Sequence, residues 1–107
     1  MPAVVAALTD ASESVRFTAL SLAADLKSKE TTQPVIDMFS RSENSGLRTS
    51  ICWALGKIGD ARAASSLIRW LGDSEKLVAE AAHSALVDLA AGKDYGINAA
   101  AWRAAFP

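Results

Sequence analysis

Cys52 and His83 carry the side chains best suited to nucleophilic or acid–base chemistry, and each is the single residue of its type in the sequence. A cysteine beside a histidine can act as a nucleophile with its general base. The two lie 31 positions apart, at equivalent places on neighbouring predicted helices. Packed helices are about 10 Å apart, which is too far for a hydrogen bond between such residues. We therefore expect no catalytic dyad and predict that His83 is a packed or inter-repeat residue.

The sequence contains no motif typical of a metal site or of a phosphate-binding loop. A single cysteine cannot form an internal disulfide, and no paired spacing of cysteine and histidine suggests a zinc site. Residues 56–59, Gly-Lys-Ile-Gly, close a predicted helix and do not open one, so they do not form a phosphate-binding loop. The expectation is a non-enzymatic chain with no catalytic residue, no metal and no cofactor.

The composition excludes several classes of protein. The chain has 107 residues, is 50% hydrophobic and carries a formal net charge of −1, which fits one domain with a small core. Near-neutral charge gives no overall attraction to nucleic acid or to an anionic membrane. No stretch approaches roughly 18 apolar residues, so no membrane-spanning helix is expected. A lone cysteine favours an intracellular setting, cytoplasmic by default.

Cys52 and His83 lie in an internal repeat of predicted helices. Alanine and leucine favour helix, and glycine and proline divide the chain into helices of roughly 8 to 15 residues. Residues 15–26, 47–58 and 78–89 align at offsets of 32 and 31 positions. Five columns of this alignment are apolar in every copy, which indicates a structural repeat: Val15/Leu47/Val78, Ala19/Ile51/Ala82, Leu22/Ala54/Ala85, Ala23/Leu55/Leu86 and Leu26/Ile58/Leu89.

The helices between these copies repeat too. Their shared pattern is an apolar pair and a third apolar residue one turn later, as in Val4-Val5/Leu8, Val35-Ile36/Phe39 and Leu67-Ile68/Leu71. The unit is a helix A followed by a helix B, and neither can bury its apolar face alone. Stacked pairs predict a single repeat domain over 1–107, with approximate repeats 2–28, 32–59 and 61–92.

The end of the chain departs from the repeat. Residues 98–106 predict a last short helix, with Asn98 as its N-cap and with Trp102 and Phe106 on one face. A solenoid has to close its terminal apolar surface, so we interpret this segment as a capping helix.

Three segments carry a family resemblance. Residues 55–64 resemble the B-helix end and turn of a short HEAT repeat, of the kind also found in phycobilin-lyase proteins, and residues 10–16 and 73–78 resemble the family's A-to-B turn. The resemblance covers roughly residues 2–92 and implies an all-α fold, a right-handed α-solenoid (α-α superhelix) of about three HEAT-like helical hairpins with a C-terminal capping helix. Tetratricopeptide repeats differ, because their period is about 34 residues and their Trp, Gly and Tyr pattern is absent.

The sequence also departs from the family pattern. Residues 41–46 lack the Asp-rich turn, and residues 27–32 lack the Gly-Asp turn of residues 59–60. The first A helix is about one turn short, which we interpret as a boundary of the sequence or a missing preceding repeat.

The resemblance implies that the outer arc of the B helices lines a concave, ligand-facing surface. Trp53 is the large aromatic residue on this arc, where the other copies carry Ser21 and Ser84. Exposed aromatics are enriched at binding hot spots, although Trp53 could instead fill a groove over an adjacent helix. We predict that Trp53 is partly exposed and near Phe17, Thr49 and Ser84. The candidate partner-binding residues are Phe17, Ser21, Asp25, Thr49, Trp53, Lys57, Glu80, Ser84 and Asp88.

The favoured hypothesis is a non-catalytic protein–protein interaction or scaffolding module with a protein or peptide partner. Nucleic acid is not expected, because Asp25, Glu80 and Asp88 would repel phosphate. Arg16 and Arg48 are expected to satisfy acidic groups and carbonyls of the turns, such as Asp10 or Glu43.

Two alternatives stay open. One is an accessory or chaperone-like lyase domain that holds a tetrapyrrole or similar ligand, which would need an apolar groove with a usable cysteine or histidine. The other is a homo-oligomerising structural module, a weak homodimer through the N-terminal helix, in which Val4, Val5 and Leu8 would contact a second copy.

Overall fold

The computed structural model describes residues 2–42 and 44–107, with Pro2 described by its backbone alone. Within these residues the chain forms helices and no strand. Two 3₁₀ turns, Lys29–Thr31 and Ala61–Ala63, lead into the second and third A helices. The α-helices are α1 (Pro2–Ala7), α2 (Glu13–Leu26), α3 (Thr32–Arg41), α4 (Ser45–Ile58), α5 (Ala64–Trp70), α6 (Lys76–Leu89) and α7 (Ala99–Ala105).

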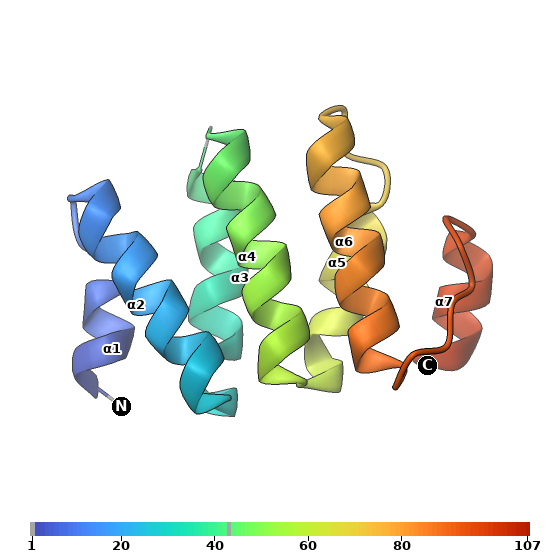
Figure 1. Ribbon diagram of the computed structural model, residues 1–107, viewed down its shortest axis with the longest axis horizontal. Coiled ribbons are helices and arrows are strands. Elements are labelled where there is room, and N and C mark those ends of the chain that lie inside the picture. The colour runs from blue at the N-terminus through green and yellow to red at the C-terminus, as the bar shows by residue number, and fades with distance from the viewer. Residues whose placement is uncertain (1, 43) are drawn as a thin grey trace.

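The helices pair and stack in chain order, as the repeat predicts. The hairpins α1/α2, α3/α4 and α5/α6 follow one another along the longest dimension of the molecule, 36 Å, and α7 lies at the far end (Figure 1). The B helices α2, α4 and α6 form the front layer in this view, and the A helices α1, α3 and α5 lie behind them. Helix α4 packs against both α2 and α6. The predicted all-α solenoid is therefore confirmed.

Side-chain caps start the B helices α2 and α4, and a left-handed residue ends each of these two helices. The side chains of Ser12 and Asn44 accept hydrogen bonds from the backbone N–H groups of Val15 and Leu47. Gly59 closes α4 with φ 75°, as glycine does at little steric cost. Lys27 adopts φ 50° at the same place after α2. Residues 27–32, which lack the glycine found at position 59, thus begin with the same left-handed geometry. Lys27 adopts it at a steric cost that glycine does not have.

The five repeat columns divide into two groups by their burial. Ala19/Ile51/Ala82 and Ala23/Leu55/Leu86 are buried in all three copies. The columns of Val15, Leu22 and Leu26 are buried in α4 and buried or half-buried in α6, but in α2 these three residues are exposed. A column that is apolar in all three copies is therefore not buried in all three. The reason is that these columns face the preceding hairpin, and no hairpin lies before α2 in the structure (Figure 1).

A small residue sets the distance between α4 and α6. A Cβ built on Gly56 would lie 3.0 Å from Cα of Ala85 and 3.2 Å from its Cβ. The backbones of the two helices approach closely here because neither position carries a large side chain.

Asp60 joins the second and third repeats. Its side chain is buried, and it accepts hydrogen bonds from Thr32 Oγ1 at 2.8 Å and from Arg62 Nη2 at 2.7 Å. The Arg62 guanidinium holds the pKa of Asp60 well below its usual range, and burial opposes this shift. The backbone N–H of Arg62 and the Thr32 hydroxyl lower the pKa by smaller amounts. The turn after α4 is thus tied to the first residue of α3.

The predicted terminal helix is present as α7, with Asn98 accepting a hydrogen bond from the N–H of Ala101. Trp102 is fully buried, and its Nε1 donates to the carbonyl of Gly96 at 2.8 Å. Tyr95 contacts the Trp102 ring edge-on, with centroids 4.9 Å apart, and the Phe106 ring lies nearly parallel to it at 6.4 Å. No helix of the described residues is long and apolar enough to cross a membrane.

Candidate partner-binding surface

The candidate surface is the outer side of the three B helices, with Trp53 on the central one. Trp53 is 44% exposed, although its sequence neighbours Cys52 and Ala54 are completely buried. The prediction that Trp53 is partly exposed is therefore confirmed. Thr49 and Lys57 lie one turn before and one turn after Trp53 and share its side of α4. Thr49 is half-buried and donates its hydroxyl to the carbonyl of Ser45, whereas Lys57 is exposed.

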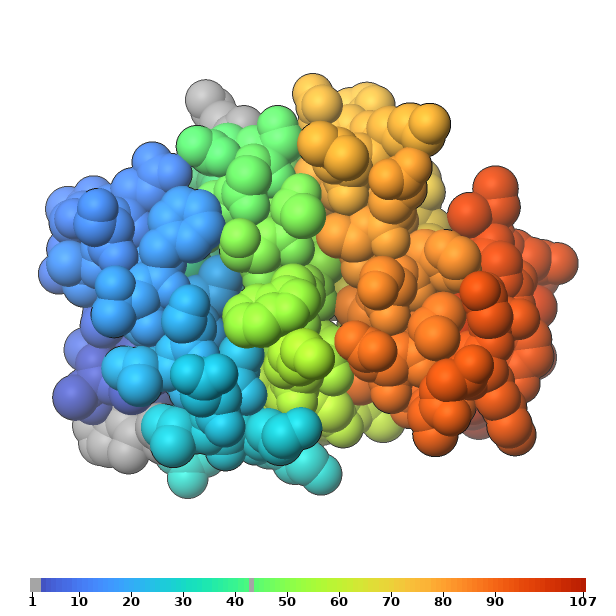
Figure 2. Space-filling view, in the orientation of Figure 1, coloured from blue at the N-terminus to red at the C-terminus, as the bar shows by residue number. Residues whose placement is uncertain are grey.

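The flanking helices contribute the other six candidates. On α2, Phe17 is half-buried, while Ser21 and Asp25 are exposed. Figure 2 shows this face of the molecule, where side chains of α2, α4 and α6 form a continuous surface. The candidates on α6 are all exposed, namely Glu80, Ser84 and Asp88.

The charges on α6 are partly engaged. Glu80 lies 3.8 Å from the ammonium of Lys76 in an exposed ion pair, which contributes little to stability. Asp88 reaches toward α4, because its Oδ2 would lie 2.9 Å from a Cβ on Gly56. Of the nine candidates, Lys57 is basic and three residues are acidic, so the surface is mixed in charge and mildly acidic.

Cys52 does not provide a nucleophile in the structure. It is fully buried, and this burial, with a smaller contribution from Asp73, raises the pKa of its thiol to about 12. The thiolate is the reactive form of cysteine, so the side chain acts as a small apolar residue.

His83 packs at the end of the stack, in agreement with the expectation for it. Its Nε2 lies 2.7 Å from Oδ1 of Asp94, and its ring meets the Trp102 ring at 65° with centroids 6.5 Å apart. The same Asp94 oxygen accepts the backbone N–H of Gly96. Sequence reasoning missed Asp94, although an aspartate two residues before a glycine is typical of a turn.

Arg16 and Arg48 bind turns, as predicted. Arg16 donates from Nη1 to the carbonyls of Asp10 and Ala11, at 2.8 and 3.0 Å. Arg48 donates from Nε to the carbonyl of Ser42 at 2.6 Å, and its guanidinium lies over the Phe39 ring. Glu43, the other partner expected for these arginines, lies outside the described residues.

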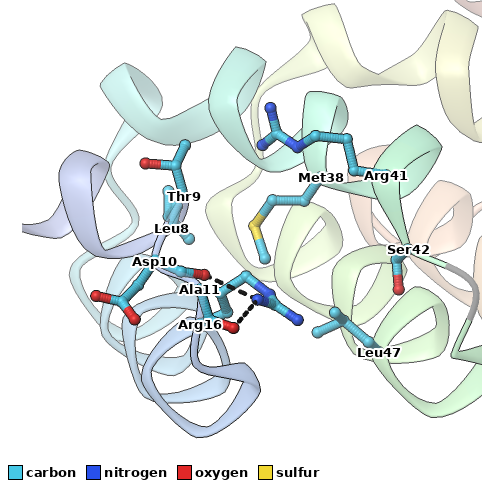
Figure 3. Close-up of a pocket in the computed structure, with 9 residues that line it drawn as sticks. All are labelled: Leu8, Thr9, Asp10, Ala11, Arg16, Met38, Arg41, Ser42 and Leu47. Atoms are coloured by element: carbon cyan, nitrogen blue, oxygen red, sulfur yellow. Dashed lines mark hydrogen bonds between the residues drawn. The ribbon is translucent and has the colours of Figure 1, made fainter.

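A pocket that sequence reasoning missed lies between the first A-to-B turn and the second hairpin (Figure 3). Its volume is about 240 Å³, smaller than the roughly 300–1,000 Å³ of ordinary small-molecule sites. Buried Leu8, Met38 and Leu47 line it, and Arg16 and Arg41 contribute cationic groups. Figure 3 shows the Arg16 guanidinium hydrogen-bonded to the two turn carbonyls, so this cation already has a structural role in the turn.

The comparisons with known proteins agree with the stacked hairpins. No curated protein shows a significant match to the chain. A family model described as HEAT repeats matches residues 1–87, which is most of the sequence. The match is to HEAT repeats in general, so the resemblance to the phycobilin-lyase kind stays a prediction. The chain belongs to the HEAT repeat family.

Proposed function

We propose that this chain is a non-catalytic protein-interaction or scaffolding module, which binds a protein or peptide partner across α2, α4 and α6. HEAT repeats generally mediate protein–protein interaction, and stacked helical repeats present extended surfaces suited to it. In this proposal the whole chain is one repeat domain, with approximate repeats 2–28, 32–59 and 61–92.

The exposure of Trp53 is the observation that carries the proposal. A half-exposed tryptophan on the central B helix offers a large apolar area beside polar residues, which is the composition of a hot spot and its rim. Serines replace it on the flanking helices, so its partner would centre on α4. Removing such an anchor typically costs about 2 kcal/mol or more of binding free energy.

The surrounding charges would set the orientation of the partner. Lys57 is exposed one turn beyond Trp53, and Asp25 on α2 and Glu80 and Asp88 on α6 are exposed on the neighbouring helices. Charges at the rim of an interface affect association rate and register more than affinity. The mildly acidic lining favours a partner segment with basic residues beside an apolar one, and it disfavours a phosphate backbone.

The lyase alternative gains no support from the geometry. That alternative needs an apolar groove with a usable cysteine or histidine, and the Cys52 thiol is buried with a raised pKa. His83 is engaged by Asp94. A cytoplasmic setting stays the default prediction of the sequence.

A pull-down with the intact chain beside Trp53→Ala and Trp53→Phe variants tests the proposal. Each captured protein is then purified, and its affinity for the chain is measured by calorimetry. We expect Trp53→Ala to weaken binding at least about 30-fold, which corresponds to the hot-spot loss, and Trp53→Phe to retain most of it. Ile97→Ala is a matched control, because Ile97 is strongly exposed on the loop before α7. Equal binding by all variants would show that the proposed surface is wrong.

A further inference from the structure

The three B helices have the same length and the same register. Helices α2, α4 and α6 each contain 14 residues, and their first residues, Glu13, Ser45 and Lys76, are also equivalent in the repeat alignment. The helices lie side by side in the front layer, and α4 packs against both of the others (Figure 1). Equivalent residues therefore form rows that cross the three helices along the long dimension of the molecule.

The row in the last turn of these helices carries charges of alternating sign. It consists of Asp25, Lys57 and Asp88, each the second-last residue of its helix. All three residues are exposed. The row before it holds Trp53 between two serines, about one helical turn or roughly 5.4 Å away. The charged row thus borders the residue on which the proposed function depends.

The two acidic residues of this row stand where a helix disfavours them. The C-terminus of a helix carries a partial negative charge, so an acidic side chain in the last turn costs stability. Neither α2 nor α6 has a basic residue in its last turn. Within residues 2–42 and 44–107, no ion pair involves Asp25, Lys57 or Asp88. Residues that oppose local stability are typical of functional positions, so the row indicates a role outside the fold.

The Asp88 carboxylate lies beside α4. A Cβ built on Gly56 would be 2.9 Å from Oδ2 of Asp88, and Gly56 directly precedes Lys57. This carboxylate is therefore at the junction of α4 and α6. A partner that crosses from one helix to the other meets a negative charge at that junction.

The spacing of the row selects the conformation of the partner. Packed helices lie about 8–10 Å apart. A polyproline II segment rises about 3.1 Å per residue with three residues per turn, so every third side chain returns to the same face after about 9.3 Å. An extended strand instead turns successive side chains to opposite faces, so residues three apart do not share a face. A polyproline II segment therefore places the side chains of positions i, i+3 and i+6 on three successive B helices.

We infer that the B-helix surface binds a proline-rich segment in the polyproline II conformation, with a basic, an acidic and a basic residue at positions i, i+3 and i+6. The basic residues lie over Asp25 and Asp88, and the acidic residue lies over Lys57. The intervening prolines pack against the exposed ring of Trp53, because aromatic side chains are the usual docking sites of such segments. This inference rests on the proposed function, since it names the chemistry of the partner for that same surface.

The inferred site uses none of the residues that were expected to form a homodimer. The sequence predicts that contact through Val4, Val5 and Leu8, but Leu8 is fully buried and cannot contribute. A homodimer through the other two residues stays a prediction, and the peptide measurements below do not depend on it.

Two synthetic peptides with blocked ends test the order of the charges. Lys-Pro-Pro-Glu-Pro-Pro-Lys carries the inferred pattern, and Glu-Pro-Pro-Lys-Pro-Pro-Glu carries its reverse. Each reads the same in both chain directions, so the test does not depend on the polarity of binding. Their affinities are measured by NMR titration of the isotope-labelled chain at low salt, with the indole N–H of Trp53 as the reporter.

We expect the first peptide to bind about tenfold more tightly than the second, because three exposed charge pairs that are weak singly act together. Lys-Pro-Glu-Pro-Lys has the same charges as the first peptide at a shorter spacing, and it should bind no better than the reversed peptide. Equal affinities of the first and second peptides would overturn the inference. So would an equally tight short peptide, or no binding of the first peptide at millimolar concentration.

Substitutions in the row should reverse this preference. The triple variant Asp25→Lys, Lys57→Glu and Asp88→Lys should bind the second peptide about tenfold more tightly than the first. Two of these changes place a basic residue at a helix C-terminus, which favours folding. Asp37→Lys is the matched control, because Asp37 is exposed on α3 in the rear layer and the change in charge equals that of Asp25→Lys. A control variant that loses the wild-type preference would contradict the role of the row.

The Trp53→Ala variant distinguishes a failure of this inference from a failure of the proposed function. If the surface binds partners through Trp53 without reading the charges, both peptides bind equally and Trp53→Ala weakens both, which overturns the inference alone. If the surface binds no partner, Trp53→Ala changes neither the proteins captured in the pull-down nor the peptide affinities, which overturns both.

Discussion

The rings of Phe39 and Trp70 stack face to face, with centroids 3.8 Å apart and planes inclined by 10°. This contact joins the ends of α3 and α5, whereas α4 and α6 approach each other through the small residues Gly56 and Ala85. Arg48 of α4 adds its guanidinium over the Phe39 ring at 5.2 Å. One stacked pair thus links three helices of two repeats.

Truncation of this stack should strongly destabilise the protein. Trp70 is almost completely buried, and replacing a buried tryptophan by alanine typically costs about 3–5 kcal/mol through lost contacts and a residual cavity. We expect Trp70→Ala to lower the free energy of unfolding by that amount in urea titrations. Trp53→Ala is the matched control and should change it by less than about 1 kcal/mol, because Trp53 is half-exposed. Equal losses would contradict the structural role of the stack.

Gly56 should resist even the smallest enlargement. Alanine favours helix over glycine by about 1 kcal/mol, but a Cβ at this position would meet the backbone of Ala85 at 3.0 Å. Backbone atoms cannot move aside as a flexible side chain can, so α4 and α6 would have to separate. We expect Gly56→Ala to lower stability by about 1–3 kcal/mol in thermal and urea unfolding. Gly72→Ala should be tolerated, because its nearest atom would be 3.7 Å away.

The Asp60 carboxylate should make stability depend on acid pH. Because its pKa is lowered in the folded protein, it stabilises the fold above the unfolded-state pKa of about 3.9, and this contribution is lost as the pH falls. We expect the free energy of unfolding of the wild type to fall between about pH 5 and pH 2 more steeply than that of Asp60→Asn. Arg62→Ala should give an intermediate slope, since Thr32 still donates to the carboxylate. Parallel acid slopes for the three proteins would contradict this role.

Much of this architecture could be predicted from spacing alone. Apolar columns at offsets of 31 and 32 residues indicate stacked hairpins, because the period of a repeat follows from the lengths of its two helices. The exposure of Trp53 followed from its place outside these columns. The same alignment failed at Val15, Leu22 and Leu26, because a column records which side a residue faces and not whether a neighbour is there.

Contacts that depend on side-chain reach could not be predicted. Asp60 and Thr32 are 28 positions apart, and their hydrogen bond requires the turn after α4 to lie beside the start of α3. The Phe39–Trp70 stack pairs residues from different columns of the A helices, so a column-by-column comparison does not reveal it. The pocket beside Arg16 likewise forms between a turn and the next hairpin.

The loop before α7 should depend on the His83–Asp94 pair. Asp94 accepts from both His83 and the N–H of Gly96, and Gly96 in turn accepts from Trp102 Nε1, so these contacts connect α6 to the capping helix. We expect His83→Ala to increase hydrogen exchange at the Gly96 amide about tenfold or more, because a hydrogen bond to a charged group contributes about 1.5 kcal/mol or more. Amides of α2, at the opposite end of the stack, serve as the internal reference and should exchange unchanged. Lys93→Ala, which alters an exposed residue of the same loop, should leave the Gly96 amide protected as in the wild type. Unchanged exchange in His83→Ala would show that the order of the loop does not depend on the His83–Asp94 contact.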